Sequence, residues 1–292
     1  MSLAAQALLS LLTALALIYI WRWVAIERAR RAAESRAPGL ARPAIGFVAN
    51  FFDTLGVGSF APTTAVFKLL KLVPDEKIPG TLNSGHALPT VTQALIFIAA
   101  VTVDPLTLVS MIGAAVVGAW FGAGIVSKLP RRAIQVGMGV ALLVAAALFV
   151  MKNLAVAPTE GQATGLHGTM LVFAVAVNFV LGILMTLGIG LYAPCLILCS
   201  MLGMSTIAAF PIMMGSCAFL MPVAGQRFVK SGKYDARAAI GLAIGGIPGV
   251  ILAWRVLDQF SVVWLRWLVV VVALYAALVM LDSARKASAE PV

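Results

Sequence analysis

The sequence has very little charge. Only 11% of its 292 residues are charged, whereas 62% are hydrophobic, and the mean hydropathy is +1.03. A water-soluble domain of this length carries about 25% charged residues, and it could not cover its surface with so few polar groups. These proportions exclude a water-soluble protein.

Several other features are scarce, and each absence excludes a class of function. The formal net charge is +10, but the basic residues are dispersed over short connections rather than gathered on one face, which argues against nucleic-acid binding. The three cysteines lie in apolar stretches and form no disulfide framework. Cys195 and Cys199 could share a soft metal at i,i+4, but no third ligand is nearby, so we expect no metal and no cofactor. No G-x-x-x-x-G-K-[ST] motif is present, which argues against nucleotide-driven pumping.

What is abundant is apolar sequence in blocks of roughly twenty residues, the length of a helix that crosses ~30 Å of hydrocarbon. Seven such spans are predicted, at 3–24, 83–103, 105–126, 133–151, 205–226, 238–257 and 262–283. The first lacks a basic leader and a cleavage site, so we interpret it as a retained anchor. Two further regions, 44–73 and 168–204, are interrupted by glycine and proline near their centres. We interpret each as a hairpin of two half-helices that enters and leaves on one side.

The basic residues predict the orientation. With the connection after the first helix placed in the cytoplasm, only Lys152, Arg255 and Arg266 of the 21 basic residues fall outside. This is a strong positive-inside bias. We therefore expect a multi-pass protein of the cell inner (plasma) membrane, with its N-terminus outside and its C-terminus in the cytoplasm.

The sequence contains an internal repeat at an offset of 132 residues. The segment T-L-G-V-G-S-F-A-P at 54–62 aligns with T-L-G-I-G-L-Y-A-P at 186–194, and six of the nine positions are identical. At the same offset Pro79 meets Pro211 and Ser84 meets Ser216. Each half is then one interrupted hairpin plus three full spans, an odd number of crossings, so the second half must be inverted in the membrane.

The predicted fold class is thus an all-α polytopic membrane protein built as an inverted repeat, with an extra N-terminal helix. Its expected divisions are an anchor and basic loop at 1–43, a first repeat at 44–151, an external linker at 152–167, a second repeat at 168–284 and a cytoplasmic tail at 285–292. Inverted repeats with broken helices are the architecture of many secondary transporters, which bind substrate near the midplane where the repeats meet.

The repeated motif has a chemical interpretation. Its glycines permit φ > 0 and leave backbone amides uncovered, while Pro62 and Pro194 suit the first turn of a second half-helix. A helix N-terminus with free N–H groups would then lie near the bilayer centre, where an oxyanion fits. The predicted substrate-binding residues are Thr54, Gly56, Gly58, Thr63, Asn83, Ser84, His86, Thr186, Gly188, Gly190, Tyr192 and Ser216. The alternative is that glycine and proline only kink packed helices and that Ser and Thr bond backbone carbonyls.

Asp53 is the one acid away from a predicted span end. An intramembrane carboxylate suggests a proton carrier or a cation ligand, and a hydrogen-bonded structural group beside the turn is the alternative. His86 leaves a similar choice between a proton relay, an anion donor and a packing residue. Asn50 and Asn178 precede the two turns and could serve either helix packing or substrate.

At these residues the sequence resembles the sulfite exporter TauE/SafE family of membrane permeases. The paired motifs carry the resemblance, supported by the N-S-G-H stretch at 83–86 and the Gly-rich span that ends in Lys128-Leu129-Pro130. It covers roughly 44–283, with 3–24 as a family-variable addition. The resemblance implies movement of sulfur-containing or organic anions such as sulfite, thiosulfate, sulfoacetate or related sulfonates, commonly outward. The second half departs from N-S-G-H, which argues against a strictly symmetric site.

The leading hypothesis is a secondary transporter of a small anion that works by alternating access and is not an enzyme. The rivals are an anion channel, an intramembrane enzyme and a structural subunit. No His/Glu metal set and no paired-Asp arrangement supports an enzyme, and Ser84 and His86 lie on different helix faces at i,i+2. The expected partners are the anion and the lipid bilayer, without nucleic acid; a homodimer is left open.

Overall fold

The computed structural model describes residues 2–30, 39–56, 58–126, 129–154, 161–188 and 190–256, with scattered helical positions between 267 and 285. The regular structure within these ranges is helical, and one isolated bridge joins Ala163 to Met204. The elements are α1 (Leu3–Ala29), α2 (Ala41–Thr54), α3 (Phe60–Leu69), η1 (Asp75–Lys77), α4 (Ile78–Gly85), α5 (Ala87–Ala100), α6 (Pro105–Val126), α7 (Arg131–Asn153), α8 (Gly168–Met185), α9 (Tyr192–Met201), α10 (Thr206–Ser231) and α11 (Ala236–Val256).

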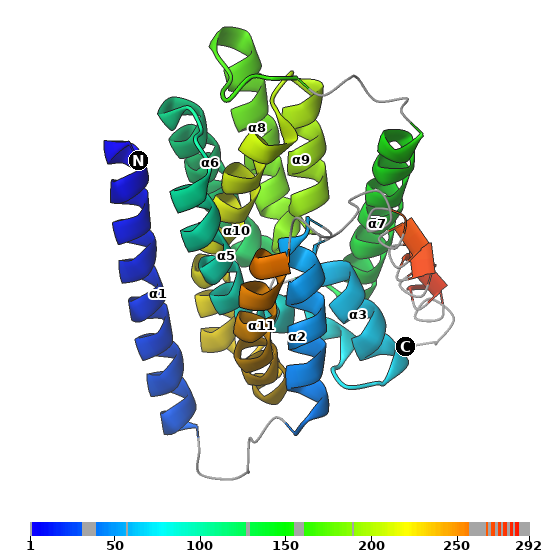
Figure 1. Ribbon diagram of the computed structural model, residues 1–292. Coiled ribbons are helices and arrows are strands. Elements are labelled where there is room, and N and C mark those ends of the chain that lie inside the picture. The colour runs from blue at the N-terminus through cyan, green and yellow to red at the C-terminus, as the bar shows by residue number, and fades with distance from the viewer. Residues whose placement is uncertain are drawn as a thin grey trace.

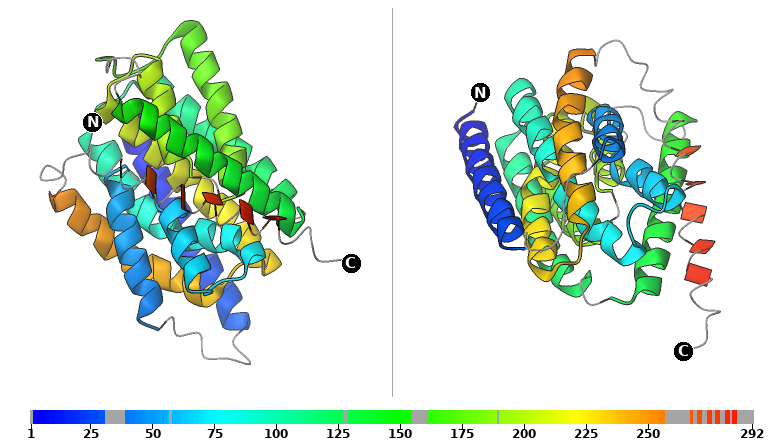
Figure 2. Two further views of the ribbon diagram at one scale, coloured as in Figure 1. Left: turned by 90° about the vertical axis from the view of Figure 1, so that its right-hand side faces the viewer. Right: turned by 90° about the horizontal axis from the view of Figure 1, so that it is seen from below.

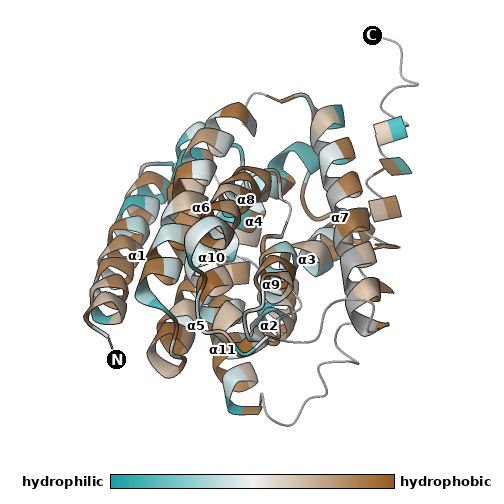
Figure 3. Cartoon of the chain, turned by 90° about the horizontal axis from the view of Figure 1, so that it is seen from above, coloured by the Kyte–Doolittle hydropathy of each residue, from teal (hydrophilic) through white to brown (hydrophobic). Residues whose placement is uncertain are grey.

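The described chain has five helices that are long and apolar enough to cross a membrane, namely α1, α6, α8, α10 and α11. Hydrophobic residues cover most of the helices when the molecule is viewed from above (Figure 3). Large apolar side chains such as Trp21 and Val172 lie exposed on the outside, which suits lipid rather than water. The multi-pass helical membrane class predicted from composition is therefore confirmed. The span predicted at 262–283 falls largely outside the described residues.

Both predicted interruptions are present. Five residues separate α2 from α3, and six separate α8 from α9. The half-helices α3 and α9 each have ten residues, and their first residues, Phe60 and Tyr192, stand at the offset of the sequence repeat. The second half-helix therefore has the same boundaries in both motifs, whereas the helix before it ends one position earlier in the second motif.

One predicted span is wrong in its extent. The span expected at 83–103 consists of two helices, α4 and α5, which begin at Ile78 and are joined at His86. Pro89 explains the break, because proline has no N–H to donate to the carbonyl of Gly85. The backbone stays nearly helical across the joint, since His86 N donates to Leu82 O at 3.1 Å and Thr90 N to His86 O at 3.0 Å. The corresponding region of α10 is continuous.

Glycine-mediated contacts hold the two halves together. On α11, a Cβ at Gly245 or Gly249 would overlap the carbonyl of Pro43 or Phe47 on α2. On α6, a Cβ at Gly118 would overlap the carbonyl of Phe179 on α8. Small residues let helix backbones approach closely in membranes, where packing rather than hydrophobic burial drives association. Each close pair joins a helix of the first half to a helix of the second.

The N-terminal helix α1 lies along one side of the bundle (Figures 1 and 2). Its buried residues recur every three or four positions and so form one face: Ala5, Leu8, Leu12, Ala16, Tyr19, Trp23 and Glu27. The Tyr19 hydroxyl donates to the carbonyl of Ser84 on α4 at 3.1 Å, and Trp23 Nε1 donates to the Tyr234 hydroxyl at 3.1 Å. Polar contacts thus fix α1 to the bundle at defined heights.

A capped turn ties α6 to the segment before α8. Asp104 accepts hydrogen bonds from the backbone N–H and the hydroxyl of Thr107, both at 2.8 Å. These bonds hold the pKa of the Asp104 carboxyl below its usual value. The Thr107 hydroxyl also donates to Leu166 O and accepts from Leu166 N. The connection at 161–167 is therefore fastened to the same end of the bundle as the start of α6.

The opposite end carries most of the described basic residues. It is formed by the ends of α1, α3 and α10 and the starts of α2 and α11, which lie together in the lower part of Figure 1. There Lys68 binds Asp75 at 2.7 Å, and Gln135 donates to the same carboxylate at 2.8 Å. We call this the basic end; it is the predicted cytoplasmic side.

Two exposed positions test the predicted orientation. Thr164 lies in the connection before α8, and Lys233 lies between α10 and α11. In intact cells, a membrane-impermeant maleimide should modify a Thr164→Cys variant but not a Lys233→Cys variant. The three native cysteines can remain, because all are buried. Labelling of Lys233→Cys alone in intact cells would reverse the orientation.

Candidate functional site

The two helix breaks have the same backbone design. Gly56 N donates to Asp53 O at 2.9 Å, and Gly188 N donates to Met185 O at 3.0 Å. Gly56 and Gly188 have φ of 88° and 91°, a left-handed conformation that costs an L-residue roughly 1–2 kcal/mol. These glycines end α2 and α8 and turn the chain away from each helix axis.

The two half-helices that follow meet in the interior. The side chains of Ser59 and Leu191 do not cap the starts of α3 and α9, but the Asp53 carboxylate accepts hydrogen bonds from the backbone N–H and the side chain of Ser59. A Cβ at Gly190 would lie 3.9 Å from Cβ of Phe60, whereas one at Gly58 would have nothing within 4 Å. Helix starts present N–H groups and partial positive charge. The two starts lie beside each other, and the one at α3 borders open space at Gly58.

A hydrogen-bonded group connects the two breaks through Gln93 on α5. Its Nε2 donates to Asp53 Oδ2 at 2.9 Å and to Thr54 Oγ1 at 3.0 Å. Its Oε1 accepts a short hydrogen bond from the hydroxyl of Tyr192, the first residue of α9. The Thr54 hydroxyl donates to Asn50 O at 2.8 Å. These side chains are nearly or fully inaccessible to solvent. Through its hydrogen bonds, the Gln93 amide joins the end of α2 to the start of α9.

A second group forms around His86, at the joint between α4 and α5. The ring Nδ1 lies 2.9 Å from Asn50 Nδ2, and Nε2 lies 3.0 Å from Thr63 Oγ1. The imidazole thereby bridges α2 to the first turns of α3. Both ring nitrogens have partners, which favours a positioning role for His86 over a free relay group.

Asn83 and Ser84 face different neighbours. Asn83 Nδ2 donates to Pro79 O at 2.9 Å and to Met185 O at 3.3 Å, at the end of α8. Asn83 Oδ1 is buried and has no hydrogen-bond partner among the described residues. Ser84 accepts from Tyr19 of α1 through its carbonyl, and its Cα packs against Gly225. Asn83 is therefore bonded to the end of α8, beside the second break, whereas Ser84 contacts α1 and α10.

Thr186, Ser216 and Gly190, three predicted site residues of the second half, have the following surroundings. Thr186 donates to Ile183 O of its own helix at 2.6 Å. Ser216 accepts from Asn178 Nδ2 at 3.0 Å, and the same amide donates to Met111 O at 2.7 Å. Gly190 does not share the positive φ of Gly56, Gly58 and Gly188. The first half thus supplies more of the polar groups near the breaks.

The grouped side chains are neutral apart from Asp53. Hydroxyls, amides and an imidazole line the region, and the bonded cations Arg30 and Lys68 lie toward the basic end. No set of three His, Cys, Asp or Glu residues in the described chain could hold a metal ion. An anion at this place would be held by helix N-termini and neutral donors, as in transporter sites at half-helix ends.

Sequence reasoning missed Gln93. A polar residue inside an apolar span is a functional hypothesis in its own right, and Gln93 stands in such a span. The repeat does not point to it, because position 225 of the other half is glycine. Asn50 precedes the first turn in the sequence, but its partner His86, 36 positions along the chain, could not be found from spacing.

Paired helix breaks in the interior of a multi-pass helical bundle are typical of membrane transporters. The family model of the sulfite exporter TauE/SafE family matches residues 1–149, and the chain belongs to this family. The match includes α1, contrary to the expectation of a variable addition, and it ends before the second half, which the resemblance also covers. The comparisons with curated proteins and with solved structures give no match.

The glycine conformations lead to a test of the two breaks. Gly58 has φ of 86° with free space around a Cβ, so Gly58→Ala should be destabilising through backbone strain alone, by roughly 1–2 kcal/mol. Gly190→Ala should be nearly neutral, because Gly190 has no positive φ. Gly113→Ala on α6, where a Cβ also meets nothing, serves as the control. Thermal unfolding in detergent measures all three, and equal losses at Gly58 and Gly190 would contradict the difference between the breaks.

Proposed function

We propose that this protein is a secondary transporter that moves a small sulfur-containing or organic anion, such as sulfite, thiosulfate, sulfoacetate or a related sulfonate, out of the cell. The observation that carries the proposal is the approach of two half-helix starts in the interior of the bundle, where Gly190, two residues before α9, lies against Phe60, the first residue of α3. Membership of the sulfite exporter family supports the choice of anion.

The donors suit an oxyanion. Backbone N–H groups at the starts of α3 and α9 would bind oxygen atoms, and the open space at Gly58 gives room beside them. Thr63 lies in the first turns of α3 and Tyr192 at the start of α9.

We further propose that the two halves form an inverted repeat that alternates access. In support, the breaks share their backbone turns and the length of the following half-helix. In Figure 1, α2 starts from the basic end and α8 from the opposite end. The close helix pairs, α2 with α11 and α6 with α8, also exchange under the repeat. Movement of one half against the other would expose the breaks to each side in turn.

Export of an anion needs no coupling ion when the cytoplasm is negative, since each charge releases ~2.3 kcal/mol per 100 mV. Asp53 is the residue placed to couple transport to H⁺ or Na⁺, because it is buried and joins the break through Gln93. Its carboxylate also lies near Tyr192 and Cys217. Coupling through Asp53 is thus a second step of the proposal, separate from the anion site.

The anion site can be tested by flux into proteoliposomes. The wild-type protein should show saturable flux of sulfite, thiosulfate or sulfoacetate, and acetate should compete poorly. Thr63→Val keeps the shape of the side chain but removes the hydroxyl beside His86 Nε2, so the KM should rise about fivefold, the effect of one hydrogen bond. Thr92→Val on α5, whose hydroxyl bonds Leu88 O of its own helix, should leave the KM unchanged.

The outcomes separate function from folding. If Thr63→Val lowers only the melting temperature and leaves the KM of every transported anion unchanged, the anion does not bind at the start of α3. Non-saturable flux that follows the membrane potential would identify a channel instead.

The role of Asp53 needs its own experiment. Asp53→Asn retains an oxygen that can accept from Gln93 Nε2, so the fold should persist. If Asp53 carries the coupling ion, flux in this variant should no longer respond to imposed pH or sodium gradients, while exchange of anion down its own gradient continues. Wild-type responses to both gradients would make Asp53 a structural group and leave uniport.

A further inference from the structure

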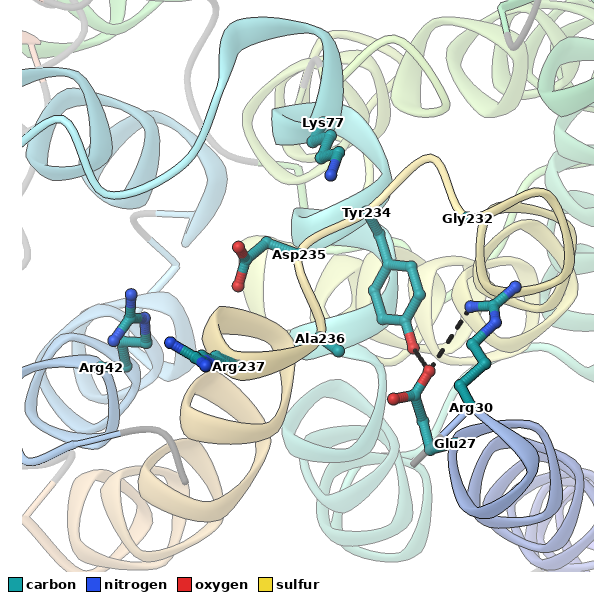
Figure 4. A pocket seen from close by; sticks show the side chains of 9 residues that line it. All are labelled: Glu27, Arg30, Arg42, Lys77, Gly232, Tyr234, Asp235, Ala236 and Arg237. Carbon is teal, nitrogen blue, oxygen red and sulfur yellow. Dashed lines mark hydrogen bonds and ion pairs between the residues drawn. The ribbon is translucent and has the colours of Figure 1, made fainter. Parts of the chain in front are cut away.

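The basic end contains a polar pocket of about 340 Å³ between α1, α2, η1 and α11. Four basic residues line it, namely Arg30, Arg42, Lys77 and Arg237. Figure 4 shows the guanidinium groups of Arg42 and Arg237 turned toward one another, with Lys77 above them and Arg30 on the far side. Cationic groups this close together create a strong positive potential, which favours an anion with several oxygens.

The two acids of the pocket are engaged in the protein. Glu27 accepts a hydrogen bond from the Tyr234 hydroxyl and lies 3.5 Å from Arg30. Asp235 caps α11 by accepting from Ala238 N at 2.8 Å. Burial and the bond to Glu27 raise the pKa of Tyr234 well above its usual value, so its hydroxyl stays protonated. The charge of the lining residues remains positive.

An apolar groove of about 250 Å³ continues from this pocket along α1 and α11. Glu27 lines both spaces. From Arg237, the groove residues Ile240 and Ile244 follow at three and seven positions along α11, which is roughly 5 and 10 Å deeper at ~1.5 Å per residue. On α1, Trp23 and Ile20 stand seven and ten positions before Arg30, which is roughly 10 and 15 Å along the helix. Leu88 of α5 also lines the groove. The groove faces outward, because Ile244 is 59% exposed.

We propose that this cleft between α1 and α11 binds an anionic phospholipid, with its phosphate in the basic pocket and an acyl chain in the apolar groove. The charge of the pocket selects an anionic headgroup, and basic pockets between transmembrane helices on the cytoplasmic side are suited to such lipids. The apolar groove gives room for an acyl chain, which a soluble anion does not have. The Trp23–Tyr234 bond joins a residue that lines the groove to one that lines the pocket.

The test uses the full-length protein in a zwitterionic detergent, with lipid binding measured by native mass spectrometry and by thermal shift. Phosphatidylglycerol should bind more tightly than phosphatidylcholine with the same acyl chains. Glycerol phosphate, which carries the headgroup charge without the chains, should not bind at comparable concentration. Binding of glycerol phosphate as tight as that of the lipid would mean that the pocket serves soluble anions, and equal binding of both lipids would remove the role of charge.

Matched variants locate the lipid. Arg237→Gln and Lys77→Gln should each weaken phosphatidylglycerol binding about fivefold, the effect of one charge at the membrane surface. Lys233→Gln removes an exposed charge at the same end, outside the pocket, and should have little effect. Ile244→Trp should close the groove and weaken both headgroup classes, whereas Ile251→Trp, seven residues further on the same face, should not. Equal effects of variant and control in both pairs would overturn the proposal.

Discussion

The structure depends on the cost of leaving backbone polar groups unpaired where water is absent. Two helices stop inside an apolar bundle, and each stop frees carbonyl and N–H groups that the bilayer cannot satisfy. Turns at Gly56 and Gly188 satisfy some of them, and Asn83 reaches the carbonyl of Met185. At the start of α3 the Asp53 carboxylate accepts hydrogen bonds from the backbone N–H and the side chain of Ser59, whereas the side chain of Leu191 gives no cap at the start of α9. Under the proposed function, an anion would bind the other N–H groups at the two starts.

The first half carries most of the polar chemistry, and the second half supplies the geometric partner. Among the described residues, no polar side chains bonded to the second break correspond to His86, Asn50, Gln93 and Asp53 of the first half. The second half contributes Tyr192, whose hydroxyl donates a hydrogen bond to Gln93. The two halves therefore share the turn that ends the first helix of each break, but they differ in the side chains around it.

The class of the protein, both interruptions and most helix positions could be predicted from the sequence, because span length and Gly-Pro punctuation act locally. The break at His86 could not, since the prediction of one span at 83–103 rests on its length and overall apolar composition, which do not show where a helix is interrupted. The partners of Gln93 and His86 were also unpredictable, because they depend on how helices far apart in the chain rotate against each other. A sequence repeat also does not guarantee the same backbone conformation: Gly190 aligns with Gly58, but it lacks the positive φ of Gly58.

The glycine contacts between halves have a consequence for synthesis. The closest neighbour of α2 is α11, which is made roughly 180 residues later, or about 10–40 s at ~5–20 residues per second. During that interval the face of α2 that ends against Gly245 and Gly249 has no protein to cover it. The nascent chain must therefore shelter this face in the insertion machinery or against lipid until α11 is made.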